Sequence, residues 1–225
     1  KRERKRPDLV VKYTPVSSAS RITALVANEI DIECGSTTST AERRKQVAFT
    51  IPTFIAATRL MVREGSGIKS FNDLAGKTVV TTKGTSSEKF FGDRNTALTL
   101  RANLTLAKDH AESFSLLEAG KADAFIMDDV LLFSLRAAAK EPTKFEITND
   151  PLTIEPLSIM MRKDDPAFKK LVDAEVTRVI MQGEITPMYR KWFESPIPPQ
   201  KLNLKLPMSY MLRDSLKSPT DWLPD

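Results

Sequence analysis

The sequence holds a single cysteine, Cys34, and a single histidine, His110. One cysteine cannot form a disulfide within the chain, and one cysteine with one histidine is too few for a Cys/His zinc site. No apolar run approaches the roughly 18 residues that a membrane-spanning helix needs. These absences argue against a disulfide-stabilised scaffold, a Cys/His metal protein and a membrane-spanning helix in this sequence. We expect no metal and no cofactor.

The motifs of common enzyme and nucleotide-binding folds are also missing. The chain has no G-x-S-x-G nucleophile elbow, no G-x-x-x-x-G-K-[ST] phosphate loop and no G-x-G-x-x-G dinucleotide fingerprint. These absences weaken the case for catalysis without excluding it. The net charge of +5 weakly favours anionic ligands. Basic residues are not interleaved with aromatic ones, so we expect no nucleic-acid partner.

What the sequence does contain is an alternation of short apolar runs with segments of helical periodicity. Such alternation favours parallel α/β sheets, and two such series are separated by the glycine-bearing residues 64–67. We therefore predict an α/β chain of two lobes. The predicted boundaries are residues 1–62 and 153–200 for lobe 1, residues 63–152 for lobe 2, and residues 201–225 for a C-terminal tail packing on lobe 1.

The local patterns predict individual elements. Apolar residues at helical spacing after Asp165 and Pro166 indicate a long amphipathic helix. Ser39 with Glu42, and Thr85 with Glu88, have the spacing of capping boxes, which predicts a helix start at each place. The expected strands span residues 9–16, 30–34, 58–62, 78–82, 104–107, 122–127, 145–148 and 158–162.

Candidate binding residues lie where predicted strands give way to helices, the place where open α/β sheets bind ligands. Arg21 and Arg43 lie near predicted helix starts, where a cation is unfavourable unless an anion intervenes. One arginine with hydroxyl groups suits a carboxylate, and a second cation suggests a second carboxylate. Asp128 could receive an ammonium group. The other candidates in such turns are Ser36, Thr38, Thr85, Ser86 and His110.

Simpler interpretations of the same residues stay open on local pattern alone. Arginines extended into solvent are about as compatible with the sequence as arginines in a site. His110 could be a surface histidine at a capped helix start, and Thr85 with Glu88 is better interpreted as a structural cap. Asp129, which adjoins the next predicted helix, is a better candidate for a helix cap than Asp128.

Several motifs together resemble one known family. They are E-C-G-S-T-T at 33–38, F-N-D-L-A-G-K at 71–77, G-T-S-S-E at 84–88, A-K-D-H at 107–110, R-K-D-D-P at 162–166 and K-W-F at 191–193. From about residue 7 to residue 199 the chain resembles the type II periplasmic solute-binding proteins of polar amino acid ABC transporters, and most closely the glutamate/aspartate-binding branch. The resemblance implies two α/β lobes joined by two crossing strands that close over one amino acid.

The resemblance also implies a function and a cellular location for the protein, and a role for each candidate residue. The protein would bind glutamate or aspartate in the periplasm, although the given chain shows no signal peptide, and would deliver it to a membrane permease without covalent chemistry. Asp128 would accept the ammonium group. The α-carboxylate would be held by Ser36, Thr38, Arg43 and Ser86, and the side-chain carboxylate by Ser18, Arg21 and His110.

The chain departs from the family pattern in three places. The family's first strand and helix, expected before Pro7, are missing, which would expose core and an unpaired sheet edge. We expect a monomer, or a dimer if a partner chain supplies that strand. Ile159 replaces a second cysteine, which leaves Cys34 unpaired, and the turn at residues 155–158 differs from the usual glycine-bearing one. Two alternatives stay open: a carboxylate-processing dehydratase with Asp128 or Glu155 as general acid, and a sensory or truncated relative with altered or lost binding.

Overall fold

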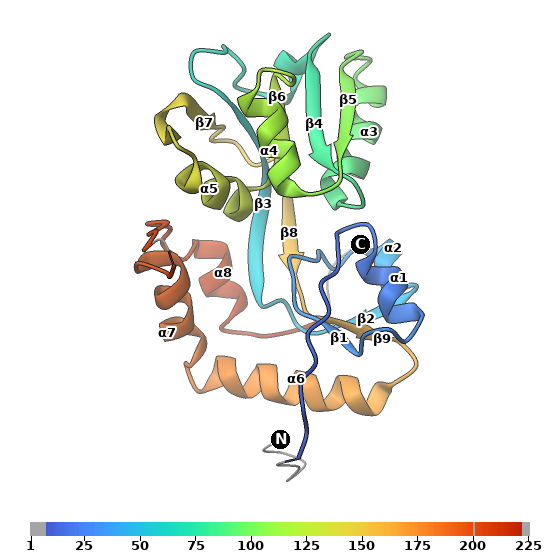
Figure 1. The fold of residues 1–225 in the computed structure, drawn as a ribbon. Coiled ribbons are helices and arrows are strands. Elements are labelled where there is room, and N and C mark those ends of the chain that lie inside the picture. The colour runs from blue at the N-terminus through green and yellow to red at the C-terminus, as the bar shows by residue number, and fades with distance from the viewer. Residues whose placement is uncertain (1–7, 200, 222–225) are drawn as a thin grey trace.

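The computed structural model describes residues 8–199 and 201–221; the basic run at residues 1–6 lies outside them. Figure 1 shows two lobes, one above the other, with strands β3 (Phe54–Arg63) and β8 (Thr153–Leu157) running between them. The upper part, here called lobe 2, is built on a six-stranded sheet, and the lower part, lobe 1, on a three-stranded sheet. The predicted two-lobed α/β fold with two crossing strands is confirmed.

Lobe 2 has a mixed sheet in the order β5-β4-β6-β3-β7, with β8 paired to β3. Strand β4 runs parallel to β5 and β6, as expected from the alternating pattern, whereas β3 is antiparallel to β6, β7 and β8. The remaining elements of lobe 2 are η1 (Phe71–Leu74), β4 (Thr78–Thr82), α3 (Ser86–Ala97), β5 (Asn103–Ala107), α4 (His110–Glu118), β6 (Ala124–Asp128), α5 (Asp129–Ala138), η2 (Pro142–Lys144) and β7 (Phe145–Ile147).

Two apolar clusters hold this sheet between its helices. Leu60 and Met61 are neighbours in β3 and are both fully buried, because successive side chains of a strand point to opposite faces. Leu60 packs with Phe91 of α3, and Met61 with Leu117 of α4. Each such side chain contributes about 1.5–3 kcal/mol by leaving water, so lobe 2 is a well-packed platform for the helix starts on its lower edge.

Lobe 1 has a much smaller sheet, in the order β1-β9-β2, with β9 antiparallel to both neighbours. The parallel strands predicted here are therefore wrong for the described residues. Its buried apolar cluster consists of Leu25, Val47, Phe49 and Met160. The elements of this part are α1 (Arg21–Val26), β1 (Ile32–Glu33), α2 (Ala41–Arg44), β2 (Val47–Phe49), β9 (Met160–Arg162), α6 (Pro166–Met181), α7 (Ile185–Tyr189) and the π-helical turn η3 (Arg190–Glu194).

Two predictions about individual elements had opposite outcomes. The long helix after Asp165 is confirmed as α6, with the Asp165 carboxylate accepting a hydrogen bond from the Phe168 N–H at 2.8 Å. Residues 9–16 form no strand, because no described strand pairs with them. Val10 and Tyr13 are 84% and 88% exposed. The apolar pattern there marks an extended segment without a partner.

The end of the chain packs against the strands between the lobes. Helix α8 (Tyr210–Ser215) contacts β3, and Leu206 packs with Ala56 of β3 and Val130 of α5. Phe54, at the start of β3, lies beside the stacked rings of Tyr189 and Phe193. The exact lobe boundaries, and the assignment of the tail to lobe 1, stay predictions.

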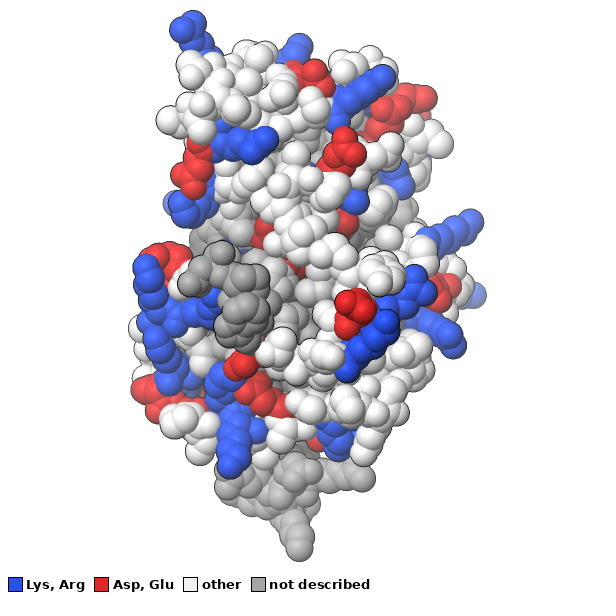
Figure 2. All heavy atoms as spheres, turned by 180° about the vertical axis from the view of Figure 1, so that it is seen from behind, with Lys and Arg blue, Asp and Glu red and all other residues white. Residues whose placement is uncertain are grey.

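The surface shows how the excess positive charge is distributed. On the face seen in Figure 2, basic and acidic side chains are intermingled over both lobes. A nucleic-acid-binding surface would instead gather Lys and Arg in one patch or stripe. Within the described residues, none of the helices combines the length and apolarity needed to cross a bilayer.

Candidate functional site

Two cavities lie where the lobes meet, and together they hold nearly all of the predicted site residues. The larger, about 1000 Å³, is lined by Thr38, Arg43 and Ser86, among others, and the smaller, about 210 Å³, is lined by Ser18, Arg21, Ser36 and His110. Asp128 lines neither cavity and is buried at the end of β6. The structure thus brings the predicted residues together from both lobes.

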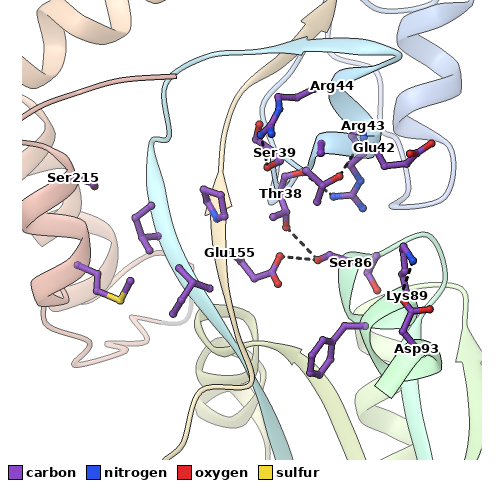
Figure 3. Close-up of a pocket in the computed structure, with 18 of the residues that line it drawn as sticks. Thr38, Ser39, Glu42, Arg43, Arg44, Ser86, Lys89, Asp93, Glu155 and Ser215 are labelled. Atoms are coloured by element: carbon purple, nitrogen blue, oxygen red, sulfur yellow. Dashed lines mark hydrogen bonds and ion pairs between the residues drawn. The ribbon is translucent and has the colours of Figure 1, made fainter. Parts of the chain in front are cut away.

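Arg43 is placed by a short helix at the wall of the larger cavity (Figure 3). The cap of α2 is Thr40, whose hydroxyl accepts from the Arg43 N–H at 3.2 Å, so the predicted Ser39–Glu42 capping box is wrong by one residue. Glu42 instead pairs with Lys45 at 2.8 Å. Because α2 has only four residues, Arg43 lies in its last turn as well as its first. The dipole argument made from the sequence therefore does not hold.

Burial, rather than the helix dipole, makes Arg43 unusual. The residue is only 9% exposed, and burial lowers the pKa of its guanidinium. Nη1 donates to the Thr38 carbonyl at 3.0 Å, and Nη2 donates to the Gly84 carbonyl at 3.1 Å. Since Gly84 belongs to lobe 2, this side chain links the two lobes.

Gly84 marks the closest approach of the lobes. Its φ is +81°, and a Cβ added there would lie 2.6 Å from the Ala19 Cα and 2.8 Å from the Ser18 carbonyl oxygen. Real Cβ atoms do not come this close to backbone atoms, so only glycine fits. The structure therefore has the two lobes in contact, as in a closed arrangement.

Ser86 begins α3, after the cap residue Thr85. The predicted Thr85–Glu88 cap is confirmed: the Glu88 N–H donates to the Thr85 hydroxyl at 3.3 Å, and the Glu88 carboxylate accepts from the Gly84 N–H at 2.6 Å. In Figure 3, Ser86 points toward Thr38 and Glu155. The Ser86 hydroxyl lies 3.2 Å from the Thr38 hydroxyl and donates to Glu155 Oε2 at 2.9 Å.

From the sequence, Glu155 was considered as a general acid and placed in a turn at residues 155–158. The turn is wrong, because Glu155 lies within β8, and the place of Glu155 in the candidate site was missed. It is 4% exposed and lies on β8, where it also accepts from the Thr58 hydroxyl at 3.2 Å and from the Thr153 hydroxyl. The available signal was a threonine and a glutamate two residues apart in a strand, which puts both side chains on one face. This spacing by itself does not distinguish a binding residue, and only the hydrogen bond from Ser86 places Glu155 at the candidate site.

Asp128 is almost completely buried, at 1% exposed, and its Oδ1 has no hydrogen-bond partner among the described residues. Burial raises the pKa of its carboxyl to about 7, with smaller contributions from Glu155 and Asp129 that Arg21 and Arg43 partly offset. A buried oxygen without a partner is costly, and an ammonium group is a suitable partner for it.

Asp129 has a structural role, but it is not the helix cap that the sequence favoured: it is the first residue of α5, and Asp128 occupies the N-cap position without a side-chain cap hydrogen bond. Asp129 Oδ1 accepts a hydrogen bond from the Val130 N–H at 2.8 Å and another from the Ala57 N–H of β3 at 3.2 Å. Its Oδ2 lies 3.4 Å from Arg59 Nε. Asp128 Oδ1 thus has no partner among the described residues, while Asp129 holds α5 against the strand that joins the lobes.

The smaller cavity contains a second buried guanidinium. Arg21 is 5% exposed, and its Nε has no hydrogen-bond partner among the described residues. Burial and, to a smaller extent, the charge of Arg43 lower the pKa of the Arg21 guanidinium to about 10. Glu33 and Asp128 act in the opposite direction. Glu33, which the sequence reasoning did not single out, lines the same cavity and accepts from the Thr37 hydroxyl at 2.7 Å.

His110 is the first residue of α4, next to the cap residue Asp109. Its Nδ1 lies 2.8 Å from the Thr82 hydroxyl, which leaves Nε2 as the ring nitrogen for a ligand. Burial lowers the pKa of the imidazole, and Arg21 lowers it further, although Asp109 acts in the opposite direction. A neutral imidazole can still donate one hydrogen bond to a carboxylate.

The described residues contain no group of three or more His, Cys, Asp or Glu side chains that could hold a metal ion. They do contain two buried arginines, Arg21 and Arg43, that form no ion pair with a carboxylate of the described chain. Alongside them lies Asp128, a buried carboxyl with a free oxygen. The arrangement suits a small zwitterion with more than one anionic group.

Comparison with known proteins gives the same result as the motifs. The model of the bacterial extracellular solute-binding proteins, family 3, matches residues 3–195. The chain is 46% identical to an L-glutamate/L-aspartate-binding protein of Pseudomonas aeruginosa over 221 residues, which cover 98% of this chain and 73% of the relative. It is 43% identical, with the same coverage, to a glutamate/aspartate import solute-binding protein of Escherichia coli.

Solved structures agree on the fold. An ancestral arginine-binding protein bound to arginine matches with a TM-score of 0.78 and 26% identity, over 84% of this chain and 83% of that protein. An ancestral arginine-binding protein bound to glutamine matches with a TM-score of 0.76, also at 26% identity, over 84% of this chain and 82% of that one. Both are binding proteins for amino acids.

Proposed function

Because the chain belongs to family 3 of the bacterial extracellular solute-binding proteins, we propose that it binds glutamate or aspartate between its lobes and delivers it to an ABC transporter. Family membership confirms the prediction of a binding protein rather than an enzyme. The names of the relatives from P. aeruginosa and E. coli support an acidic amino acid as the ligand.

The observation that carries this proposal is the charge of the buried side chains. Burying a guanidinium is costly unless an anion pairs with it. Arg21 and Arg43 are 5% and 9% exposed and lack a carboxylate partner in the described chain. A ligand with two carboxylates would supply both anions. Its single ammonium group would match the free oxygen of Asp128.

We assign the ligand groups accordingly. The α-carboxylate binds Arg43, Thr38 and the start of α3 at Ser86, where backbone N–H groups point outward, and Ser36 reaches it from the smaller cavity, which Ser36 lines. The side-chain carboxylate lies in the smaller cavity, with Ser18, Arg21 and His110. Closure is favourable because the ligand contacts both lobes only when they are together. Glutamine, which lacks the second negative charge, binds more weakly.

The proposal extends to the surroundings of the protein. As a family of extracellular proteins, these chains work outside the cytoplasm, and we place this one in the periplasm. Its partner is the membrane permease of an ABC importer, in agreement with the name of the E. coli relative, an import solute-binding protein. We propose that the protein acts as a monomer with the lobe boundaries predicted above.

Calorimetric titration of the ligand-free protein tests the proposal. The protein is unfolded, dialysed and refolded to remove any bound amino acid, and is then titrated with L-glutamate, L-aspartate and L-glutamine. We expect saturable heat with at least one of the two acidic amino acids and affinity at least tenfold weaker for glutamine. No heat with either acidic amino acid would refute the function.

A further inference from the structure

The strand register gathers four polar side chains on one face of the sheet in lobe 2. Thr58 of β3 pairs directly with Asp128 of β6 on one side and with Thr153 of β8 on the other. Directly paired residues of antiparallel strands point to the same face. Glu155 follows Thr153 by two residues along β8, so its side chain shares that face. All four residues are buried or partly buried.

The hydrogen bonds around Glu155 have a fixed direction. A carboxylate can only accept, and Glu155 accepts from the hydroxyl groups of Thr58 and Thr153 at Oε1 and from Ser86 at Oε2. Ser86 has a single hydroxyl proton, which it donates to Glu155 in this hydrogen bond. The Ser86 oxygen therefore presents only lone pairs to the cleft, where the Thr38 hydroxyl already approaches within 3.2 Å.

This direction changes what Ser86 can recognise. A hydroxyl whose proton is engaged repels a carboxylate oxygen and attracts a donor such as an ammonium group. The α-carboxylate can then use the backbone N–H of Ser86 but not its hydroxyl. Asp128 belongs to the same group of side chains and has a free oxygen. The Ser86 oxygen and Asp128 Oδ1 are thus acceptors from different elements that belong to one connected group of side chains.

We propose that Glu155 is a positioning residue for the ligand's ammonium group, because it holds the Ser86 hydroxyl as an acceptor beside Asp128. It thereby selects α-amino acids over dicarboxylates that lack the amino group. The inference rests on the proposed function, since it concerns the same ligand. Glu155 acts through Ser86 and does not itself bind the ligand.

The test compares L-glutamate with glutarate, which has both carboxylates and no ammonium group. In Glu155→Gln the side-chain amide can donate to Ser86 and turn its hydroxyl around. We expect affinity for L-glutamate to fall at least tenfold and affinity for glutarate, measured by competition at millimolar concentration, to change less than threefold. Ser86→Ala should show the same ligand dependence. Thr96→Val, whose hydroxyl bonds the Gly92 carbonyl within α3 and lies outside this network, should change L-glutamate affinity less than threefold.

The difference between L-glutamate and glutarate is the readout that a merely structural role would not move, and a pH profile adds the effect of the Glu155 charge on Asp128. The groups that act on Asp128 are Glu155, Asp129, Arg21 and Arg43. Removing the negative charge at position 155 lets Asp128 ionise at lower pH. The loss of L-glutamate affinity on acidification below about pH 7 should therefore begin at lower pH in Glu155→Gln than in the wild type.

The outcomes separate the two proposals. If the wild type binds neither amino acid, the proposed function fails. If the wild type binds L-glutamate but Glu155→Gln weakens both ligands equally, or leaves the affinities and the pH profile unchanged, only the role of Glu155 is overturned. Thermal unfolding establishes that each variant folds. Should Glu155→Gln not fold, Ser86→Ala with the same pair of ligands decides, and equal weakening of both overturns the role.

Discussion

The two lobes contribute to the site in different ways. Lobe 2 packs apolar clusters on both faces of a six-stranded sheet and presents Ser86 and His110 from the starts of α3 and α4. Lobe 1 has strands of two or three residues, a cluster of four buried apolar side chains, and its arginines on helices of six and four residues. The candidate site is thus formed between a well-packed lobe 2 and a thinly packed lobe 1 that carries the two arginines.

This difference indicates that the orientation of Arg43 depends on contact between the lobes. Arg43 is oriented by one carbonyl of its own lobe and by one carbonyl of the other, at Gly84. A side chain oriented across an interface is in place only when the interface is formed. We therefore expect changes in lobe 1 to act mainly on ligand affinity, and the change at Asp128 in lobe 2 to act also on the stability of the ligand-free protein.

The largest expected effect is that of Arg43→Ala in lobe 1. Removing a buried charge that pairs with a ligand carboxylate costs about 3 kcal/mol or more, which is over 100-fold in affinity for every amino acid ligand. Calorimetry measures the loss. Lys45→Ala, on the exposed end of the same helix, is the matched control and should change affinity less than twofold. Equal effects of the two substitutions would contradict the role of Arg43.

Asp128→Asn should have two effects of opposite sign. Loss of the carboxylate that receives the ammonium group weakens L-glutamate binding by about 30-fold or more. The ligand-free protein, by contrast, becomes more stable above pH 7. Because burial raises the pKa of Asp128 from 3.8 to about 7, the folded state holds its proton more tightly than the unfolded state. Stability from this group is full below about pH 4 and is lost as pH rises through 7.

The pH dependence of unfolding checks this second effect. The contribution has an upper limit of roughly 4 kcal/mol between pH 4 and pH 8. In urea titrations of ligand-free protein, the stability difference between Asp128→Asn and the wild type should therefore grow in favour of the variant from pH 5 to pH 8. A difference independent of pH would show that Asp128 is not buried in its carboxyl form as the structure indicates.

Gly84→Ala tests the contact between the lobes. Its Cβ would lie 2.6 Å from the Ala19 Cα, so closure is obstructed and affinity for L-glutamate should fall about tenfold. Small-angle X-ray scattering with ligand should show a more open protein than the wild type. Gly65→Ala is the matched control, because Gly65 has φ +71° but no atom within 4 Å of an added Cβ. If Gly65→Ala weakens L-glutamate binding as much as Gly84→Ala does, backbone strain rather than the contact between the lobes explains the effect.

The smallest expected effect is a change in selectivity. His110→Ala removes one hydrogen-bond donor to the ligand's side-chain carboxylate, so affinity for L-glutamate should fall about tenfold while that for glutamine falls less than threefold. Competition binding gives both values. The Ser113 hydroxyl also lies 2.9 Å from the Thr82 hydroxyl that His110 contacts. Ser113→Ala therefore controls for disturbance of the hydrogen bonds around Thr82. An equal loss for both ligands in His110→Ala would remove His110 from the selective contacts.

Several features were predictable because they depend on neighbours in sequence. The helix starts at Thr85 and Asp165 follow from side chains that bond backbone groups three residues away. The two-lobed fold follows from the alternation of strands and helices, interrupted at residues 64–67. The failure at residues 9–16 has the same origin, since an apolar pattern describes a strand but not the partner it needs.

The candidate site was predicted only as a set of residues. The sequence singled out Arg21, Arg43 and Asp128 by residue type and position, and the structure places them in one buried region. Glu155 and the Gly84 carbonyl were missed as parts of the site, because their partners lie 69 and 41 residues away along the chain. Contacts of that separation have no local pattern.

By itself, the sequence determined the class of fold, the family and the residue types of the candidate site, all of which depend on local periodicity and motif spacing. Only the tertiary structure decided how much water reaches those residues and which groups they face. It put two arginines out of solvent without carboxylate partners, left Asp128 with a free oxygen, and directed the proton of Ser86 toward Glu155. Burial and hydrogen-bond direction are set by distant segments meeting in space.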